Sequence, residues 1–477
     1  MTTANDTLAA IATGRFGLGA RPGELGLAAA DPRGWLLAQL PRHSGAPAEL
    51  AGLAPGSEIL ASFLAAREEQ RAARREATRG AATDPVQRVQ NRVREVLLPH
   101  YLAQAAARTR VALATTTPFR ERLVQFWTNH FAVSVDKPIC LGIAGALENE
   151  AIRPHVCGRF ADLLLAVETH PAMITYLDNQ QSVGPHSTLG TRANRRAQAG
   201  AAPKGKTGLN ENLAREILEL HTLGVDGGYT QADVTTFAAV ITGWSIGGGQ
   251  GRLAQGAPGT FQFRPALHEP GPKTVVGRYY AEAEFGQGAA VLAGLAAHPS
   301  TARHLATKLA RHFVADEPPP ALVERLAHAY RSSDGDLPAV YEALVGWDGA
   351  WAPAPGKFKT PAEFVYSALR AVDVVPKEPK ALLAGFEVLG QRHYSPGSPA
   401  GWPDRAQDWD GADALMKRIE WSVALADRVG ESRSALATLD ATLGPLASDH
   451  TRGALARAAS GSQALVLYLM SPEFQRR

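Results

Sequence analysis

Residues 207–244 place polar side chains on the apolar side of a helix, which strongly limits how the chain can fold. At about 100° per residue, one face of this helix is apolar and consists of Leu213, Ala214, Ile217 and Leu218. Asn210 and His221 project near the middle of that face, and Glu216 lies at its border. An unpaired polar group on a buried face costs about 1–3 kcal/mol. We therefore expect Asn210 and His221 to have partners inside the protein.

The ends of this helix carry residues that start and stop helices. Asn210 can act as an N-cap, and Gly224 suits the left-handed position that follows a helix. After a turn, Thr230 begins a second helix, with Asp233 at the spacing of a capping box. The region is therefore predicted to form two helices joined by a turn. Its balanced charge argues against a DNA-binding helix-turn-helix motif.

A second helix, far upstream, has the same unusual design. Thr117 can cap it, and Pro118 occupies its first position. Its apolar stripe consists of Phe119, Leu123, Phe126, Trp127 and Phe131. His130 projects into the centre of this stripe, and Asn129 lies beside it. An inward histidine is either a core residue with a local hydrogen bond or part of a site, and two of them favour a shared site.

Helical periodicity lapses in one region. Residues 260–263 alternate between apolar and polar side chains, and residues 273–276 have the pattern of a second short strand. The turn between them contains His268 and Glu269. We predict one short β-hairpin near residues 260–276, with these two side chains at its tip.

The rest of the chain is predicted to be helical, apart from one loop. Residues 188–208 are basic, rich in Gly and Ala, and almost free of large apolar residues. This composition is typical of a mobile loop. The expected fold class is therefore mostly α, with residues 1–477 forming a single large multi-helix domain.

Composition excludes several classes of function. The chain has 477 residues and a formal net charge of +3, so binding to nucleic acid or to an anionic membrane has no compositional support. Two cysteines are too few for a disulfide framework or a thiolate zinc site. The N-terminus lacks the basic and apolar regions of a secretory signal, which favours a cytoplasmic location, and no apolar run suits a membrane span. No Walker loop, dinucleotide-binding glycine pattern, GxSxG elbow or HExxH motif is present.

Many blocks of this sequence resemble the DUF1800 family of bacterial proteins. The resemblance begins at residues 15–23 (RFGLGARPG) and ends at residues 471–476 (SPEFQR). Between them lie FWTNHF at 126–131, GRFADLL at 158–164, HPAM at 170–173, YLDN at 176–179, the segment 210–228, and TGW at 242–244. The family has no assigned function, so the resemblance implies no catalytic residues. Because DUF1800 proteins are commonly encoded beside DUF1501 proteins that carry a twin-arginine signal, it implies a DUF1501-like partner. Export in the folded state with that partner is the alternative to a cytoplasmic location.

Two kinds of chemistry fit the inward-facing side chains. In the first, a divalent metal is bound, and the candidate ligands are His130, His221, His268 and Asp178. In the second, no metal is needed: an imidazole acts as base and Glu216 as acid, while Arg215 holds an anionic group. The candidate catalytic residues are His130, His221, Glu216, Arg215, Asn129 and Asn210. No organic cofactor is predicted.

Two functional classes follow from these residues. One is a hydrolase or lyase that acts on a small-molecule or saccharide ligand. The other is a non-catalytic binding or assembly partner, whose polar residues form a structural network between helices. The segment 390–409 adds three aromatic residues, Tyr394, Trp402 and Trp409, which either pin a loop or offer a flat surface to a ligand.

Overall fold

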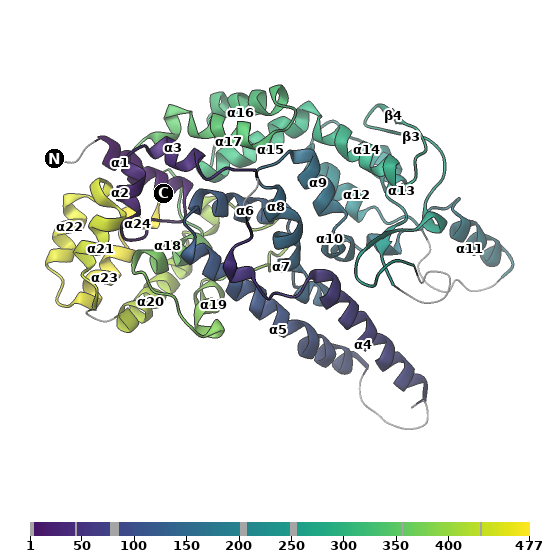
Figure 1. Ribbon diagram of the computed structural model, residues 1–477, viewed down its shortest axis with the longest axis horizontal. Helices are drawn as coiled ribbons and strands as arrows, with labels where there is room; N and C mark the ends of the chain where they lie inside the picture. The colour runs from purple at the N-terminus through teal and green to yellow at the C-terminus, as the bar shows by residue number, and fades with distance from the viewer. Residues whose placement is uncertain are drawn as a thin grey trace.

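The computed structural model describes residues 4–42, 45–76, 85–200, 208–248, 255–354, 356–429 and 432–477. It is mostly helical, with short antiparallel strand pairs, as predicted (Figure 1). The helices before residue 200 are α1 (Ala4–Ile11), α2 (Glu24–Ala29), α3 (Pro32–Leu37), α4 (Gly56–Glu76), α5 (Pro85–Ala114), α6 (Pro118–His130), α7 (Ala144–Leu147), α8 (Arg153–His155), α9 (Phe160–Glu168), α10 (Pro171–Tyr176) and α11 (Thr188–Gln198).

The helices after residue 200 complete the fold. They are α12 (Asn212–Glu216), α13 (Gln231–Val240), α14 (Phe285–Ala296), α15 (Pro299–Phe313), α16 (Pro320–Ser332), α17 (Leu337–Val345), α18 (Pro361–Ala371), α19 (Pro379–Val388), α20 (Ala412–Val429), α21 (Ala435–Thr442), α22 (Asp449–Ala456), α23 (Gly461–Leu469) and α24 (Pro472–Gln475). Three π-helical turns interrupt or extend these helices, namely η1 (Ala12–Phe16), η4 (Glu148–Ile152) and η6 (Ile217–His221). Short 3-10 turns are η2 (Ala48–Leu50), η3 (Pro138–Gly142), η5 (Asn179–Gln181), η8 (Pro265–Leu267), η9 (Asp348–Trp351), η10 (Ala406–Asp408) and η12 (Gly444–Leu446).

The first helices, α1 and α2, and the last helix, α24, lie toward the same end of the long axis of the molecule (Figure 1). Helices α20 to α24 gather at one end, and α11, α13 and the strands β3 and β4 lie at the other. Helix α6 lies between them, and α4 and α5 leave the body together as an arm. No helix among the described residues is long and apolar enough to cross a membrane.

The two predicted apolar stripes lie in the larger of two hydrophobic clusters. In that cluster Trp127 of α6 and Leu213 of α12 are fully buried. The smaller cluster is built mainly by α18 to α24 and contains Phe364, Leu439 and Tyr468. Burial of the stripes accounts for the helical periodicity in the sequence, because each stripe is the face that leaves water on folding.

The predicted helical pair in residues 207–244 is present. Helix α12 continues directly into η6, Gly224 has a φ of 86°, and Thr230 and Asp233 form the capping box of α13. The side-chain oxygen of Asn210 accepts a hydrogen bond from Asn212 N at 3.0 Å. The π-helical character of η6, which periodicity does not predict, places His221 at the end of a widened turn. Such turns are frequent at functional sites.

The strands form two separate pairs. β1 (Trp244–Ile246) pairs with β2 (Phe261–Phe263), and β3 (Lys273–Val275) pairs with β4 (Arg278–Tyr280), both antiparallel. A short hairpin is therefore present, but residues 261–263 pair with β1 rather than with β3. Two physical causes explain the pairing of β2 with β1 instead of β3. Val276 and Gly277 both have positive φ, which suits a tight two-residue hairpin turn and folds β4 back onto β3. The Arg264 side chain donates to the carbonyl oxygens of Ile246 and Gly248, which holds β2 against β1.

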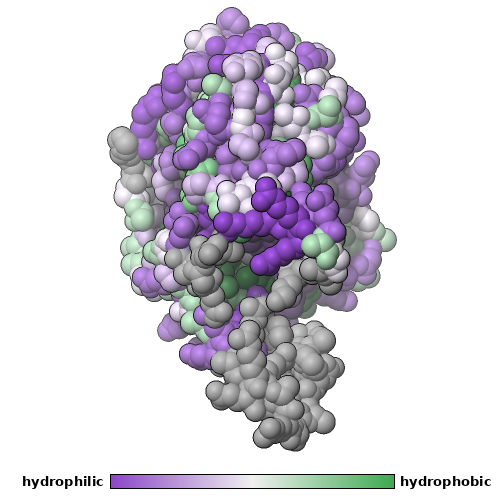
Figure 2. All heavy atoms as spheres, turned by 90° about the vertical axis from the view of Figure 1, so that its right-hand side faces the viewer, coloured by the Kyte–Doolittle hydropathy of each residue, from purple (hydrophilic) through white to green (hydrophobic). Residues whose placement is uncertain are grey.

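The segment predicted as a mobile loop contains a helix. Residues 188–198 form α11, and Ser187 caps it by accepting a hydrogen bond from Gly190 N at 3.0 Å. Ala, Arg and Gln favour a helix even where no apolar stripe exists. Residues 201–207 lie outside the described residues. The face of the molecule that carries α11 is mainly hydrophilic (Figure 2), and α11 exposes Arg192, Arg195 and Arg196.

A buried hydrogen-bond chain ties α6 to the rest of the fold and can be tested. Trp127 Nε1 donates to Tyr341 Oη at 2.7 Å, and Tyr341 Oη donates to the Val156 carbonyl oxygen at 2.9 Å. Tyr341→Phe leaves Trp127 Nε1 and the Val156 carbonyl oxygen without a partner. We expect it to lower the free energy of unfolding by about 1–3 kcal/mol for each of these two groups. Urea denaturation would measure the change. Tyr279→Phe is the control because Tyr279 is exposed, and equal stabilities of the two variants would contradict the expectation.

Candidate functional site

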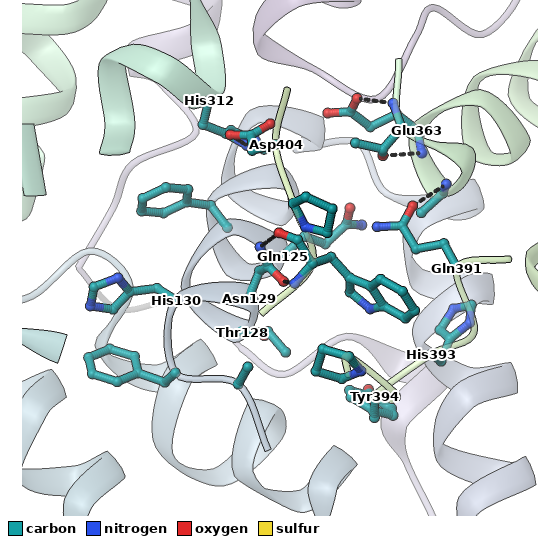
Figure 3. A pocket seen from close by; sticks show the side chains of 18 of the residues that line it. Gln125, Thr128, Asn129, His130, His312, Glu363, Gln391, His393, Tyr394 and Asp404 are labelled. Atoms are coloured by element: carbon teal, nitrogen blue, oxygen red, sulfur yellow. Dashed lines mark hydrogen bonds and ion pairs between the residues drawn. The ribbon is translucent and has the colours of Figure 1, made fainter. Parts of the chain in front are cut away.

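A cavity lies between α6, α15, α18 and the segment 390–409, which we call the roof loop. Its volume is about 360 Å³. Figure 3 shows side chains from all four elements directed toward the same space, among them Asn129, His312, Glu363 and Asp404. The walls mix aromatic and charged groups, as expected of a small-molecule site.

Helix α6 supplies one wall of this pocket through a single stripe of side chains. The stripe consists of Arg122, Gln125, Phe126, Asn129 and His130. These positions are three, four, seven and eight residues from the first, so they lie on one face of the helix. The other face, with Leu123 and Trp127, is core. The motif FWTNHF therefore serves packing and the pocket at once.

His130 lies at the inner end of the α6 stripe and is buried. Its Nε2 is 3.1 Å from the carbonyl oxygen of His221. A carbonyl can only accept, so Nε2 carries the proton, and Nδ1 keeps its lone pair. Nδ1 is buried and has no hydrogen-bond partner in the described part of the chain. Burial, and then the nearby charge of Lys308, lowers the pKa of His130 well below its usual value, which keeps the ring neutral.

His221 lies directly behind His130, outside the pocket wall. The two ring centres are 6.1 Å apart. His221 Nδ1 is 2.8 Å from Oε1 of Glu168, and both side chains are completely buried. Glu168 was not identified from the sequence. The available signal is a carboxylate in the last turn of α9, after a run of apolar residues.

Helix α15 supplies the opposite wall with Lys308, Arg311 and His312. Lys308 is half-buried, and among the described residues it has neither a hydrogen bond nor an ion pair. Burial is the main cause that lowers the pKa of Lys308 to about 8, with a contribution from Arg311. The sequence shows these side chains at helical spacing, but it does not show that they face α6.

His312 is held between two charged neighbours. Arg122 Nε donates to His312 Nε2 at 3.3 Å, and His312 Nδ1 is 3.3 Å from Asp404 Oδ2. Burial lowers the pKa of His312 to about 4. Burial acts to raise the pKa of Asp404, but His312 and Lys357 together bring it to about 2. Both ring nitrogens are engaged, so His312 positions Asp404 and Arg122 rather than reacting itself.

The roof loop is fastened to α6 by one amide side chain. Asn129 Nδ2 donates to the Trp402 carbonyl oxygen at 3.0 Å, and Trp402 N donates to Asn129 Oδ1 at 2.7 Å. Gly401 next to it has a φ of 86°, and a Cβ there would lie 2.3 Å from the Asn129 carbonyl oxygen, so glycine is required. Trp402 faces the pocket, whereas buried Trp409 donates to the Pro403 carbonyl oxygen at 3.0 Å and pins the loop. Trp409 thus pins the loop, as one of the two alternatives predicts, and Trp402 lines the pocket.

The remaining wall is organised by a buried carboxylate. Glu148 has no exposed side-chain surface, lies 3.1 Å from Arg108 Nε and accepts a hydrogen bond from Tyr394 Oη at 3.3 Å. Next to it, Tyr366 Oη is 3.0 Å from His393 Nε2. Arg108, Tyr366, His393 and Tyr394 all line the pocket. They come from segments far apart in the sequence, which gave no sign that they meet.

The other predicted site residues lie elsewhere. Arg215 pairs with Glu211 at 3.1 Å, and burial raises the pKa of half-buried Glu216. Asn210 donates to the carbonyl oxygens of Leu177 and Asp178, at 3.2 and 3.1 Å. The structure thus brings together His130, Asn129 and, behind them, His221.

The four candidate metal ligands are not gathered in one place. Asp178 pairs with Lys137 at 2.6 Å, and His268 Nε2 is 3.2 Å from Glu282. His268 belongs to the region of the two strand pairs, while His130 and His221 lie in the helical core. Within the described ranges, no group of three or more His, Cys, Asp or Glu residues is arranged to hold a metal ion.

Together the fold and the site define a large, mostly helical protein with a cationic pocket roofed by a Pro/Gly-rich loop. The chain belongs to the DUF1800 family, described as a protein family of unknown function, whose model matches residues 11–476. No curated protein matches the chain, and no solved structure matches it.

The fastening of the roof loop leads to a local prediction. Asn129→Ala removes both hydrogen bonds to Trp402, so we expect loop peptides to exchange amide hydrogens about 10-fold faster, equivalent to about 1.4 kcal/mol. Hydrogen-exchange mass spectrometry would measure this, with peptides of α9 as an internal reference. Asn5→Ala is the control because Asn5 bonds only to the distant Ala29 carbonyl. Unchanged exchange in residues 390–409 would show that the clamp does not hold the loop.

The imidazoles predict how stability depends on pH. The pKa is lowered, mainly by burial, in His130, His304, His312 and His393. Below about pH 6.5 the unfolded chain therefore binds more protons than the folded one. The free energy of unfolding decreases as the pH is lowered. We expect a loss of roughly 1 kcal/mol per ring between pH 6.5 and 5.5. Urea denaturation at both values tests this. His304→Gln should flatten the dependence, and replacement of exposed His186 should not.

Proposed function

We propose that the pocket binds a small carboxylate-bearing molecule and that the protein is an acid–base enzyme of the lyase or hydrolase type. The observation that carries this proposal is Lys308. It lies in a cavity of about 360 Å³ and forms no ion pair among the described residues, although Asp404 is near enough to influence it. A buried cation without a partner is costly, and a bound anion would remove that cost.

The charges of the wall support an anionic ligand. The pocket is lined by the basic residues Arg108, Arg122, Lys308, Arg311, Arg392 and Arg405 and by the acidic residues Glu363, Asp404 and Asp408. Glu363 pairs with Arg122, and Asp404 with His312 and Lys357. Arg311 donates to the Asp316 carbonyl, and neither it nor Arg405 pairs with a carboxylate in the described ranges. Lys308, Arg311 and Arg405 are thus available to an incoming carboxylate.

The uncharged aromatic residues of the pocket wall suit a ligand that contains a ring. Trp402, Tyr394 and Phe126 line the pocket beside the cations. Aromatic faces next to charged groups are the usual lining of sites that bind a small molecule with one apolar face. A sugar acid has both an apolar ring face and a carboxylate, so it is the class of ligand that these walls fit best.

Two groups of the pocket can give or take a proton. Lys308, with its pKa lowered to about 8, exchanges a proton near neutral pH, which suits a general acid or base. His130 offers the lone pair of Nδ1. With a carboxylate held by Arg311 and Arg405, the neutral amine form of Lys308 would remove a proton from the adjacent carbon, and a leaving group on the next carbon would depart with its bonding electrons as the double bond forms. In a hydrolase, the same amine would take the proton of the attacking water.

Variants of Lys308 test this proposal directly. Lys308→Met should weaken binding of glucuronate about 10- to 100-fold, because a charge-assisted hydrogen bond contributes about 1.5–3 kcal/mol. Lys380→Met is the control because Lys380 is exposed and lies outside the pocket. Glucose, which lacks the carboxylate, is the control ligand. Calorimetric titrations that find no saturable binding of any sugar acid, or equal binding by both variants, would reject the anionic ligand.

A second function is favoured by the satisfied side chains of the same pocket. His312, Asn129 and Thr128 all use their hydrogen bonds within the protein, as in a network that only fixes packing. This pattern fits a non-catalytic partner of a DUF1501-like protein. The two functions differ in the titration above, because a purely structural network would bind neither glucuronate nor its neutral analogue.

A further inference from the structure

A second cavity lies where the first and last blocks of the family resemblance meet. It has a volume of about 60 Å³ and lies among η1, α18 and the segment that follows α24. Its basic lining residues are Arg15, Lys359, Arg476 and Arg477. The proposed function does not use it. The motifs RFGLG and SPEFQR, which have no role in the main pocket, are therefore brought together around a common space.

Lys359 is the central charge of this cavity and is buried. Its Nζ donates to Ser367 Oγ at 3.1 Å and lies 3.9 Å from the centre of the Phe474 ring. In the described part of the chain no carboxylate pairs with it, although Glu363 is near enough to influence it. Burial, together with the cations Arg477, Arg418 and Arg122, lowers the pKa of Lys359 to about 7. The protein thus holds a lysine where its charge is poorly compensated.

Two of the three arginines of the cavity, Arg15 and Arg477, have N–H groups without an acceptor among the described residues. Arg15 is buried and donates to the carbonyl oxygens of Ala350 and Ala354, but its Nε has no acceptor in the described ranges. Arg477 lies 2.8 Å from Glu363 through Nη2, while its Nε and Nη1 are buried without acceptors among the described residues. Buried donors almost always have a partner. Three unused donors therefore belong to two residues that line one cavity.

The acidic and basic side chains around the cavity also favour a bound anion. Glu363 is shared by Arg122 and Arg477, so it cannot also balance Arg15 and Lys359. Glu473 also lines the cavity, but it accepts hydrogen bonds from Ser448 N and Thr451 rather than from a cation. Burying charges without compensation is expensive. An anion between Arg15, Lys359 and Arg477 would both neutralise the excess and accept the unused donors.

We propose that this cavity binds a small inorganic oxyanion, phosphate or sulfate. A water needs about 10–15 Å³ of such space, so the cavity has room for a tetrahedral oxyanion but not for a metabolite. Bound there, the anion would join η1 to the segment after α24, which are neighbours in space but lie at opposite ends of the chain.

The thermal stability of the full chain tests this proposal. Phosphate or sulfate, added at constant ionic strength against a bulky organic anion, should raise the midpoint of unfolding in a saturable way. The expected rise is about 3 °C at a hundredfold excess over Kd. Such salts also stabilise proteins by exclusion from the surface, so the decisive readout is a matched pair of variants. Lys359→Met should lose the saturable rise, whereas exposed Lys380→Met should keep it.

Two further measurements keep the inference separate from the main pocket and from folding defects. Lys308→Met, which removes the proposed ligand contact in the large pocket, should retain the oxyanion effect. Ion chromatography of dialysed and then denatured wild-type protein should release about one equivalent of phosphate or sulfate, and this does not depend on any variant folding. Absence of a retained oxyanion, together with an equal response of Lys359→Met and wild type to added oxyanion, would overturn the proposal.

Discussion

Helix α6 is buried along nearly its whole length, and the arrangement of the molecule depends on how its polar side chains are paired. Glu121 forms a two-bond ion pair with Arg153, at 2.5 and 3.0 Å. Arg122 reaches Gly17 and Glu363, and Asn129 reaches the roof loop. A buried charge that lost its partner would be strongly destabilising. The N-terminal segment, α8, α18 and the roof loop are therefore all positioned by the need to satisfy one helix, and the pocket is the space that remains between them.

The sequence predicts this helix better than it predicts the pocket. Periodicity identifies the core stripe of α6 and the inward direction of His130, because both follow from the angle between successive residues. It also places Asn129 next to His130. Glu168, Lys308 and Asp404 were not identified as site residues. Each belongs to a segment whose own pattern is ordinary, and its importance arises only from the residues it faces.

Two expectations about local structure illustrate the same limit. The low apolar content of residues 188–198 suggested a loop, yet capping by Ser187 and good helix-forming residues are sufficient for α11. The two strands near residues 261–263 and 273–275 were recognised, but their partners depend on the Val276–Gly277 turn and on the reach of Arg264. Strand propensity is local, whereas pairing is decided by turn geometry and by distant side chains.

Glu363 links the two cavities electrostatically. Burial acts to raise its pKa, but Arg477 and Arg122 outweigh that effect and hold the carboxyl ionised. Arg122 lines the large pocket and Arg477 the small one. An anion bound in either cavity would change the potential at the same carboxylate, so occupation of one cavity would alter the affinity of the other for an anion. By linkage the effect is reciprocal.

The Asn129 clamp also determines how the pocket can exchange with solvent. The roof loop is joined to α6 there through a single residue, Trp402, whose N–H and carbonyl both bond to the Asn129 side chain. Net hydrogen-bond energies of about 1 kcal/mol are small compared with the stability of a whole domain. Separation of Trp402 from Asn129 is thus a far more frequent event than unfolding of the core. The rest of the roof loop is held by Tyr394, Asp404 and Trp409, so the Asn129 clamp controls only the short stretch around Trp402, where the pocket wall can open without unfolding the helices.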